Sequence, residues 1–313
     1  MTTYIPILNS EIDPESPVTE SLAQRWRDNP IAIAEGDSAA PRINPGAISV
    51  GGKGADGVFD NSTTITGGPG FYEFTTIARS ANIVLPVCTI MRIAGNSVWS
   101  GVVTVPHLSD GLPTASGSQG INEEKDKCEA LGAIFGVDAT ANSVGGGSYG
   151  ADGTWAGDAG FGSRGRKIDV NRYWSTRKPL IGGRGGSYSG AAFKGGGGAL
   201  VLLVEGDLDL SSCTISADGQ TGDASNGGGS GGGSIIVIAT GTIKNGTFSA
   251  RGGAGGGSGN GGGGGVIQLI CSGFLGSQTI SVAGGAGGSA GESGFALSST
   301  VTADQIRTIL QRL

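Results

Sequence analysis

The sequence is poor in charged, aromatic and histidine residues, and each shortage excludes a class of function. Only 15% of the 313 residues are charged and the net charge is -6, so the chain is neither a charged disordered region nor a general nucleic-acid binder. His107 is the single histidine, and nothing near it supports a Ser-His-Asp arrangement. We therefore expect no enzyme of that kind.

Metal-binding patterns and long apolar runs are also missing. None of the four cysteines falls at metal-ligand spacing, so we expect no metal and no cofactor, and we predict that Cys88, Cys213 and Cys271 are buried as small apolar side chains. No stretch approaches the roughly 20 apolar residues of a membrane-spanning helix. The N-terminal residues lack a basic region followed by an apolar one, so no membrane span and no secretory signal are expected.

Glycine fills the place of the missing residue types, with 64 copies that follow no strict three-residue period. Collagen is therefore excluded. Between residues 195 and 291 one pattern occurs three times: a glycine tract, an aliphatic run, a polar turn and a second short β-prone run. The aliphatic runs are too short and too β-branched for helices, so they predict buried strands. They cover residues 199–204, 234–238 and 266–270.

Two structures can use such glycine tracts. They can form tight turns at the corners of a β-solenoid, or a bundle of left-handed polyproline-type helices whose backbones hydrogen-bond. Short strands expected at 63–65, 72–76, 82–85, 89–93 and 98–105 have spacing that suits stacked turns, and the repeats favour the first structure. We predict a mainly β fold with elongated β-solenoid or β-helix-like repeats and glycine-rich turns; the alternative is a polyglycine-helix bundle.

A short helix is expected near each end of the chain. At the N-terminal end, Ser16 is a suitable N-cap and Pro17 suits the first helical position, while Asn29 and Pro30 should end the helix. Its apolar stripe consists of Val18, Leu22 and Trp26. At the C-terminal end, Thr302 and Gln305 form a capping box, and we predict that this second helix caps the open end of the repeats.

These features divide the chain into five predicted segments. They are an N-terminal attachment segment with a short helix (1–45), a β-rich domain (46–110), an insertion rich in glycine, aromatic and basic residues (111–194), the glycine-rich β repeats (195–295) and the C-terminal helix (296–313).

Residues 16–43 resemble the N-terminal segment of many tail and tail-fibre proteins of tailed bacteriophages. The resemblance is carried by Ser16-Pro-Val-Thr, Leu22, Trp26, the run Asp28-Asn-Pro-Ile-Ala-Ile-Ala-Glu-Gly36 and Ala40-Pro-Arg-Ile43. It implies a virion structural protein that docks on other tail or baseplate proteins through Val18, Leu22, Trp26, Asn29 and Pro30. By family analogy such fibres are homotrimers, assembled in the host cytoplasm and located in the phage tail of the virion.

The insertion contains the residues most suggestive of binding. Between residues 160 and 194 the only acidic residue is Asp169, whereas basic and aromatic side chains are crowded there. Aromatic faces stack on sugars and arginine pairs with anions, although an inter-subunit contact uses the same residue types. The candidate surface-binding residues are Tyr149, Trp155, Arg164, Arg166, Arg172, Tyr173, Trp174 and Arg177.

The sequence therefore predicts a phage tail-fibre or tail-tip component that binds a host cell-surface glycan or protein, with neither enzymatic activity nor nucleic-acid binding. One alternative is a polysaccharide depolymerase, which needs two carboxylates at a defined separation. Glu205, Asp207 and Asp209 alternate along one predicted strand, but a solvated strand face explains them more simply. The other alternative is a bacterial surface adhesin, which the missing signal sequence disfavours.

Overall fold

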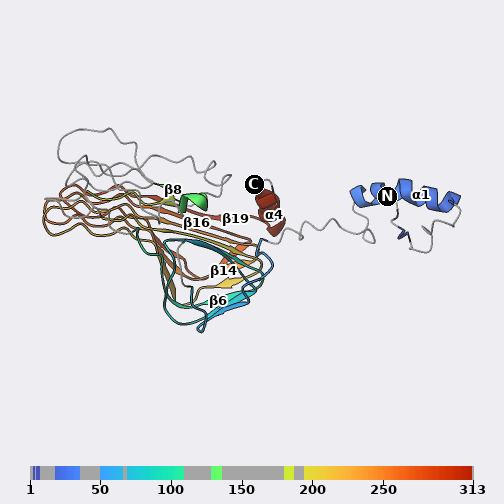
Figure 1. Ribbon diagram of the computed structural model, residues 1–313, viewed down its shortest axis with the longest axis horizontal. Coiled ribbons are helices and arrows are strands. Elements are labelled where there is room, and N and C mark those ends of the chain that lie inside the picture. The colour runs from blue at the N-terminus through green and yellow to red at the C-terminus, as the bar shows by residue number, and fades with distance from the viewer. Residues whose placement is uncertain are drawn as a thin grey trace. The chain divides into compact units, whose positions relative to one another are not determined.

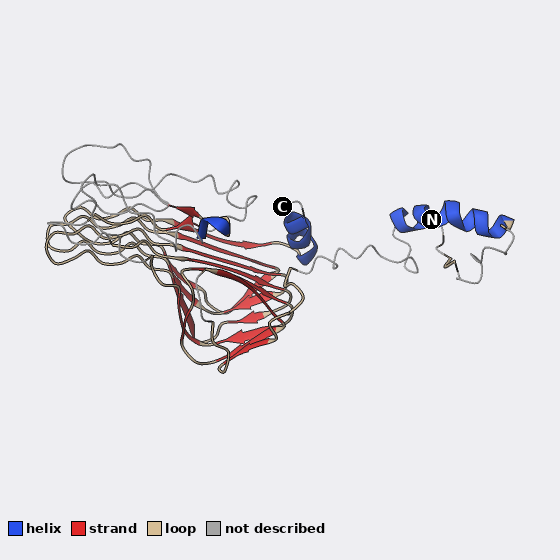
Figure 2. Cartoon of the chain, in the orientation of Figure 1, coloured by secondary structure: helices blue, strands red, loops and turns tan. Residues whose placement is uncertain are grey.

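A computed structural model describes residues 3, 5–7, 18–35, 50–65, 69–108, 128–135, 180–186 and 194–311 (Figures 1 and 2). The chain divides into two compact units, Met1–Ser49 and Val50–Leu313. The predicted attachment segment lies inside the first unit.

The first unit contains helix α1 (Glu20–Glu35), which is longer than the sequence suggests because it continues through Pro30. The prediction that Asn29 and Pro30 end the helix is wrong. The Asn29 amide accepts a hydrogen bond from Ile5 N (3.1 Å) and donates one to Ile5 O (2.9 Å). These contacts fasten the middle of the helix to the preceding chain, and they help to offset the destabilisation that an internal proline causes.

The start and the buried face of α1 also differ from the prediction. Ser16 and Pro17 lie outside the described residues, and the observed N-cap is Thr19, whose hydroxyl accepts from Leu22 N at 3.2 Å. Of the expected apolar stripe only Leu22 is buried, since Val18 is 66% and Trp26 is 53% exposed.

The second unit is mainly β and contains three parallel sheets. Sheet A consists of β1 (Val58–Asp60), β3 (Thr76–Arg79), β6 (Ser97–Trp99), β11 (Leu208–Asp209), β14 (Thr242–Lys244) and β17 (Gly273–Leu275). Sheet B consists of β2 (Gly70–Phe74), β5 (Cys88–Ile93), β10 (Ala199–Val204), β13 (Ser234–Ala239), β16 (Val266–Cys271) and β19 (Phe295–Thr300). Sheet C consists of β4 (Ile83–Val84), β7 (Gly101–Thr104), β12 (Cys213–Ser216), β15 (Thr247–Ser249) and β18 (Thr279–Ser281). A separate parallel pair joins β8 (Ile134–Phe135) to β9 (Leu180–Ile181).

The chain visits the three sheets in a fixed cyclic order, B then A then C, from β2 to β7 and again from β10 to β19. In sheet B the first cycle joins the later ones directly, because β5 pairs with β10 along its whole length, from Cys88 opposite Ala199 to Ile93 opposite Val204. The described residues within 46–110 and 195–295 therefore build the same sheets, whereas the sequence predicted two separate segments.

The main core is shared by all three sheets. Its buried members include Phe59, Ile77 and Trp99 from sheet A, and the sheet B and sheet C side chains that face them. Phe59 packs edge-on against Trp99, with ring centroids 5.5 Å apart. Aliphatic residues fill most of the later cycles, although Phe248 of β15 is also fully buried in this core.

The strands expected at 72–76, 82–85 and 89–93 overlap β2, β4 and β5, and the prediction is most accurate at the aliphatic runs. Residues 199–204, 234–238 and 266–270 lie in β10, β13 and β16, and every residue of these three strands is buried. The short strands β14 and β17 were missed, whereas β11 lies within the strand expected through Glu205, Asp207 and Asp209. The predicted strand at 63–65 is not formed, and the one at 98–105 is interrupted at Ser100, just before Gly101, whose φ is +84°.

Helix α4 (Ala303–Gln311) begins with the predicted capping box: Thr302 N donates to Gln305 Oε1 (2.9 Å), and Gln305 N donates to Thr302 Oγ1 (3.2 Å). Its place differs from the predicted cap on the open end. Ile306 is buried in a second cluster on the outward face of sheet B, whereas every second residue of the edge strand β19 stays exposed.

Gln268 interrupts this outward face. It lies between Ile236 of β13 and Leu297 of β19 in the register, and it is 1% exposed. Neither its Oε1 nor its Nε2 has a hydrogen-bond partner among the groups that the structure describes. Such buried orphan groups destabilise a fold by about 1–3 kcal/mol.

We therefore expect Gln268→Leu, which keeps the volume and removes both polar atoms, to raise the free energy of unfolding by about 1–2 kcal/mol. Gln268→Glu would bury an unpaired charge and should lower it by about 3 kcal/mol or more. Denaturant unfolding measures both. A Gln268→Leu protein less stable than the parent would show that the amide makes a favourable interaction.

Candidate functional site: glycine hairpins and carboxylate contacts

Glycine-rich segments project from the ends of the sheet B strands (Figure 2). We call residues 217–233, 250–265 and 282–294 the glycine hairpins; each runs from a sheet C strand to the next sheet B strand. Each consists of an outgoing and a returning arm that hydrogen-bond to one another. In the second hairpin, for example, Gly262 N donates to Gly253 O at 2.9 Å. The tracts are therefore long paired arms and not the tight corners that the sequence predicted.

Hydrogen bonds between the arms recur at every third residue. In the second hairpin the donors are Gly259, Gly262 and Gly265. Neighbouring hairpins follow the same rule, since Gly219 and Gly222 of the first hairpin donate to Arg251 and Ala254 of the second, both at 2.8 Å. A three-residue repeat is the period of polyproline-type helices.

Backbone crowding, not an unusual φ angle, demands glycine along most of the arms. A Cβ placed on Gly262 would overlap the carbonyl oxygen of Ser230, and one on Gly285 would overlap that of Gly253. Neither residue has a φ in the left-handed region that favours glycine. The side chain is excluded because another backbone occupies its space.

Short polar side chains link the ends of the hairpins. Asn226 Oδ1 accepts from Ser258 N at 2.7 Å, and Asn260 Oδ1 accepts from Ser289 N at 2.9 Å, so each hairpin is tied to the next. Sequence reasoning missed these residues, although an Asn or Asp in the middle of a glycine tract is a turn signal.

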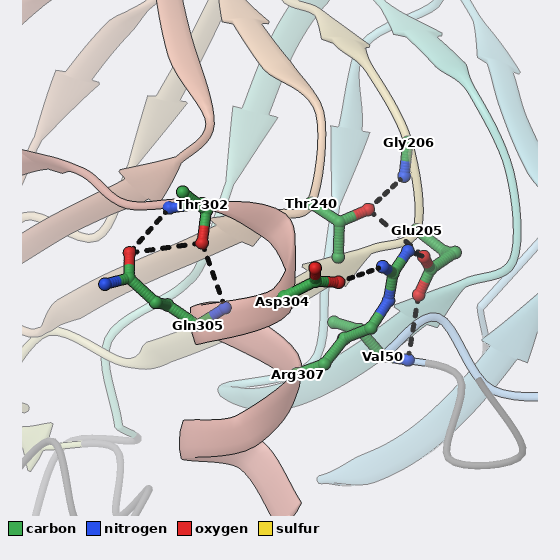
Figure 3. Close-up of polar contacts among 8 residues, drawn as sticks. All are labelled: Val50, Glu205, Gly206, Thr240, Thr302, Asp304, Gln305 and Arg307. Atoms are coloured by element: carbon green, nitrogen blue, oxygen red, sulfur yellow. Dashed lines mark hydrogen bonds and ion pairs between the residues drawn. The ribbon is translucent and has the colours of Figure 1, made fainter. Parts of the chain in front are cut away.

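The three carboxylates considered for a depolymerase do not form a free pair. Asp209 lies 2.7 Å from Lys244 Nζ, and Asp207 Oδ1 accepts from Thr242 N at 2.6 Å. Glu205 forms an ion pair with Arg307 and accepts from Val50 N at 3.1 Å (Figure 3). Only Asp209 lies in a strand, so the three do not form one strand face, although Asp207 is exposed and the other two are partly exposed. Each carboxylate holds two parts of the chain together.

The Asp209 contacts also change its acidity. Hydrogen bonds from Lys244 and Ser211 lower the pKa of the Asp209 carboxyl to about 2. Cys88, Cys213 and Cys271 are buried thiols, as predicted, and burial raises the pKa of Cys213 to about 12. A thiol with so high a pKa is a poor nucleophile.

All eight candidate surface-binding residues, from Tyr149 to Arg177, lie outside the described residues, so their role stays a prediction. The candidate attachment residues are described. Leu22 and Asn29 are buried within the first unit, whereas Val18, Trp26 and Pro30 are exposed. The prediction that this segment contacts a partner therefore rests on these three exposed residues.

Comparisons with protein-family models, with curated proteins and with solved structures found no match. In the part of the chain that the structure describes, no helix is long and apolar enough to cross a membrane. The same residues contain no group of three or more potential metal-binding side chains.

Gly262→Ala should lower the free energy of unfolding by about 2 kcal/mol, because the new methyl group would displace a backbone of the neighbouring hairpin. The matched control is Gly273→Ala, where the nearest atom would be Thr242 Oγ1 at 3.9 Å; its stability should stay the same or rise by up to about 1 kcal/mol. Thermal or denaturant unfolding compares them. Equal losses in both variants would contradict the crowding argument.

Asp209 should contribute to stability only above a threshold pH. Its folded pKa of about 2 is below its ordinary value of 3.8, so its contribution is present above about pH 4 and is lost as the pH falls toward 2. Asp209→Asn should thus flatten the stability profile between pH 4 and pH 2. At pH 7 the loss should stay below about 1 kcal/mol, because the pair is partly exposed. Parallel profiles for both proteins would refute the assignment.

Proposed function

We propose that this chain is a bacteriophage virion protein, a tail-fibre or tail-tip component that contacts the host surface during adsorption. The observation that carries the proposal is the resemblance of residues 16–43 to the N-terminal segments of phage tail proteins. The location is then the phage tail, after assembly in the host cytoplasm.

The first unit supports an attachment role. Residues 1–49 form a compact unit of their own, and α1 leaves Trp26 and Ile31 more than two-fifths exposed. Exposed large apolar residues on a helix are suited to a protein contact, because their burial against a partner releases water. The partner would be another tail or baseplate protein.

The second unit supports a stiff body. Its cyclic strand order and in-register parallel pairing suit a β-solenoid, in which each turn of chain stacks on the previous one. The three-residue hydrogen-bond period of the hairpins suits polyproline-type helices. We therefore propose that both structures considered from the sequence coexist: a solenoid that carries a polyglycine bundle.

The remaining properties follow from this role. The chain would act as a homotrimer by analogy with phage fibres, and it would bind a host glycan or protein through the basic and aromatic residues 149–177. It would not be an enzyme. A depolymerase is disfavoured because Glu205, Asp207 and Asp209 are all engaged in contacts within the chain.

A deletion tests the proposal. Particles produced with a chain lacking residues 1–45 should lose the protein from the tail, while the purified variant should keep the circular dichroism of the β unit. The matched variant Trp26→Ser should lower incorporation without changing stability, because Trp26 is exposed. Full incorporation of the deleted chain would rule out attachment through this segment.

The purified full-length protein also tests the alternative function, polysaccharide depolymerisation. Host polysaccharide incubated with the full-length protein should release no reducing ends. If the folded protein does release reducing ends, the depolymerase is favoured over the proposed function.

A further inference from the structure

The second unit begins at a residue that is held from both sides. Val50 is 3% exposed. Its N–H donates to Glu205 Oε2 at 3.1 Å, and its carbonyl accepts from Arg92 Nε at 3.0 Å. Both partners are charged, and hydrogen bonds to charged groups are about twice as strong as neutral ones.

The next two residues, Gly51 and Gly52, have no room for a side chain or adopt a backbone conformation that favours glycine. A Cβ on Gly51 would overlap the carbonyl group of Ile93, at the end of β5. Gly52 has a φ of +73°, which a residue with a side chain adopts only with strain. Residues 50–52 are therefore packed tightly against the end of sheet B.

Glu205 connects this point to the last helix. While its Oε2 accepts from Val50, its Oε1 accepts from the Thr240 hydroxyl at 3.2 Å and pairs with Arg307 of α4 (Figure 3). The Thr240 hydroxyl in turn accepts from Gly206 N at 2.9 Å. One carboxylate thus joins the start of the unit, two successive sheet B strands and the C-terminal helix.

Apolar packing reinforces the same connection. Ile306, next to Arg307, is 2% exposed and belongs to the same buried cluster as Val50, Val201 and Leu203. Arg307 also lies 3.3 Å from Asp304, but that carboxylate is 93% exposed. The partly buried contact with Glu205 is therefore the stronger of the two.

We propose that α4 is a clamp that fixes the point where the chain from the first unit enters the β body, with Glu205 as the shared positioning residue. The mechanical part of this inference rests on the proposed function: if residues 1–45 attach to the particle and the body binds the host, tension enters the body at Val50. Because α4 lies at the C-terminal end of the sequence, its contacts would keep that tension from detaching the first strands of the β body.

Hydrogen exchange on the full chain tests the clamp without any particle. In Glu205→Gln, the amides of Val50 to Lys53 and those of α4 should both exchange roughly tenfold faster, the factor expected for loss of one charge-assisted hydrogen bond. The glycine hairpins should be unaffected. Trypsin should also cleave faster after Lys53, which is exposed.

Two further variants make the result decisive. Arg307→Gln alters only the helix side of the contact and should loosen Val50 to Lys53 to a similar degree, although it leaves the hydrogen bond from Val50 to Glu205 in place. Asp304→Asn, which removes only the exposed partner of Arg307, should change neither segment. If Arg307→Gln loosens α4 while Val50 to Lys53 keep their protection, α4 is not a clamp.

Single-molecule pulling tests the mechanical part. With handles at the N-terminus and at Ser225, in an exposed turn of the first glycine hairpin, the force of the first unfolding event should fall in Glu205→Gln and Arg307→Gln but not in Asp304→Asn. An unchanged force in all three would overturn the mechanical role. Failure of the chain to enter particles would instead refute the proposed function and leave the exchange result standing.

Discussion

The second unit depends on one spacing, the distance between neighbouring parallel strands in sheet B. Strands in a sheet lie roughly 4.8 Å apart, and a glycine arm leads directly into β10, β13, β16 and β19. The ladder already begins on glycine: Ser234 N donates to Gly198 O, and Val266 N donates to Gly233 O, both at 2.9 Å. The arms therefore enter the sheet at strand spacing.

At that spacing the side chains of an arm cannot point away from the neighbouring arms, as they do on the two faces of a sheet. A strand presents its side chains above and below the sheet, so only two directions must stay open. An arm with a three-residue repeat points its residues in three directions. Where neighbouring backbones lie on all of these sides, as around Gly262 and Gly285, a side chain fits nowhere. The glycine content is thus a consequence of packing the arms in a bundle, and it is compatible with a rigid structure.

The sequence predicts well what depends on neighbouring residues. The aliphatic runs give β10, β13 and β16, and Thr302 with Gln305 gives the start of α4, because each signal lies within a few residues. It predicts poorly what depends on distant groups. Pro30 lies inside α1, where the contact between Asn29 and Ile5 joins residues 24 positions apart. The strands β14 and β17 are three residues long, too short for a period to show.

The glycine tracts and Glu205 both show that contacts between distant residues cannot be predicted from the sequence. The tracts left two structures open because the sequence reveals that side chains are absent but not which backbone takes their place. Glu205 looked like a member of an acidic strand face, since its partner Arg307 lies 102 positions away. In a parallel sheet, a residue at the end of one strand lies beside the end of the neighbouring strand and beside any segment that packs there. The contacts of a carboxylate at such a position are therefore set by the neighbouring strand, and the three acids that suggest hydrolysis in the sequence hold neighbouring segments of the chain together in the structure.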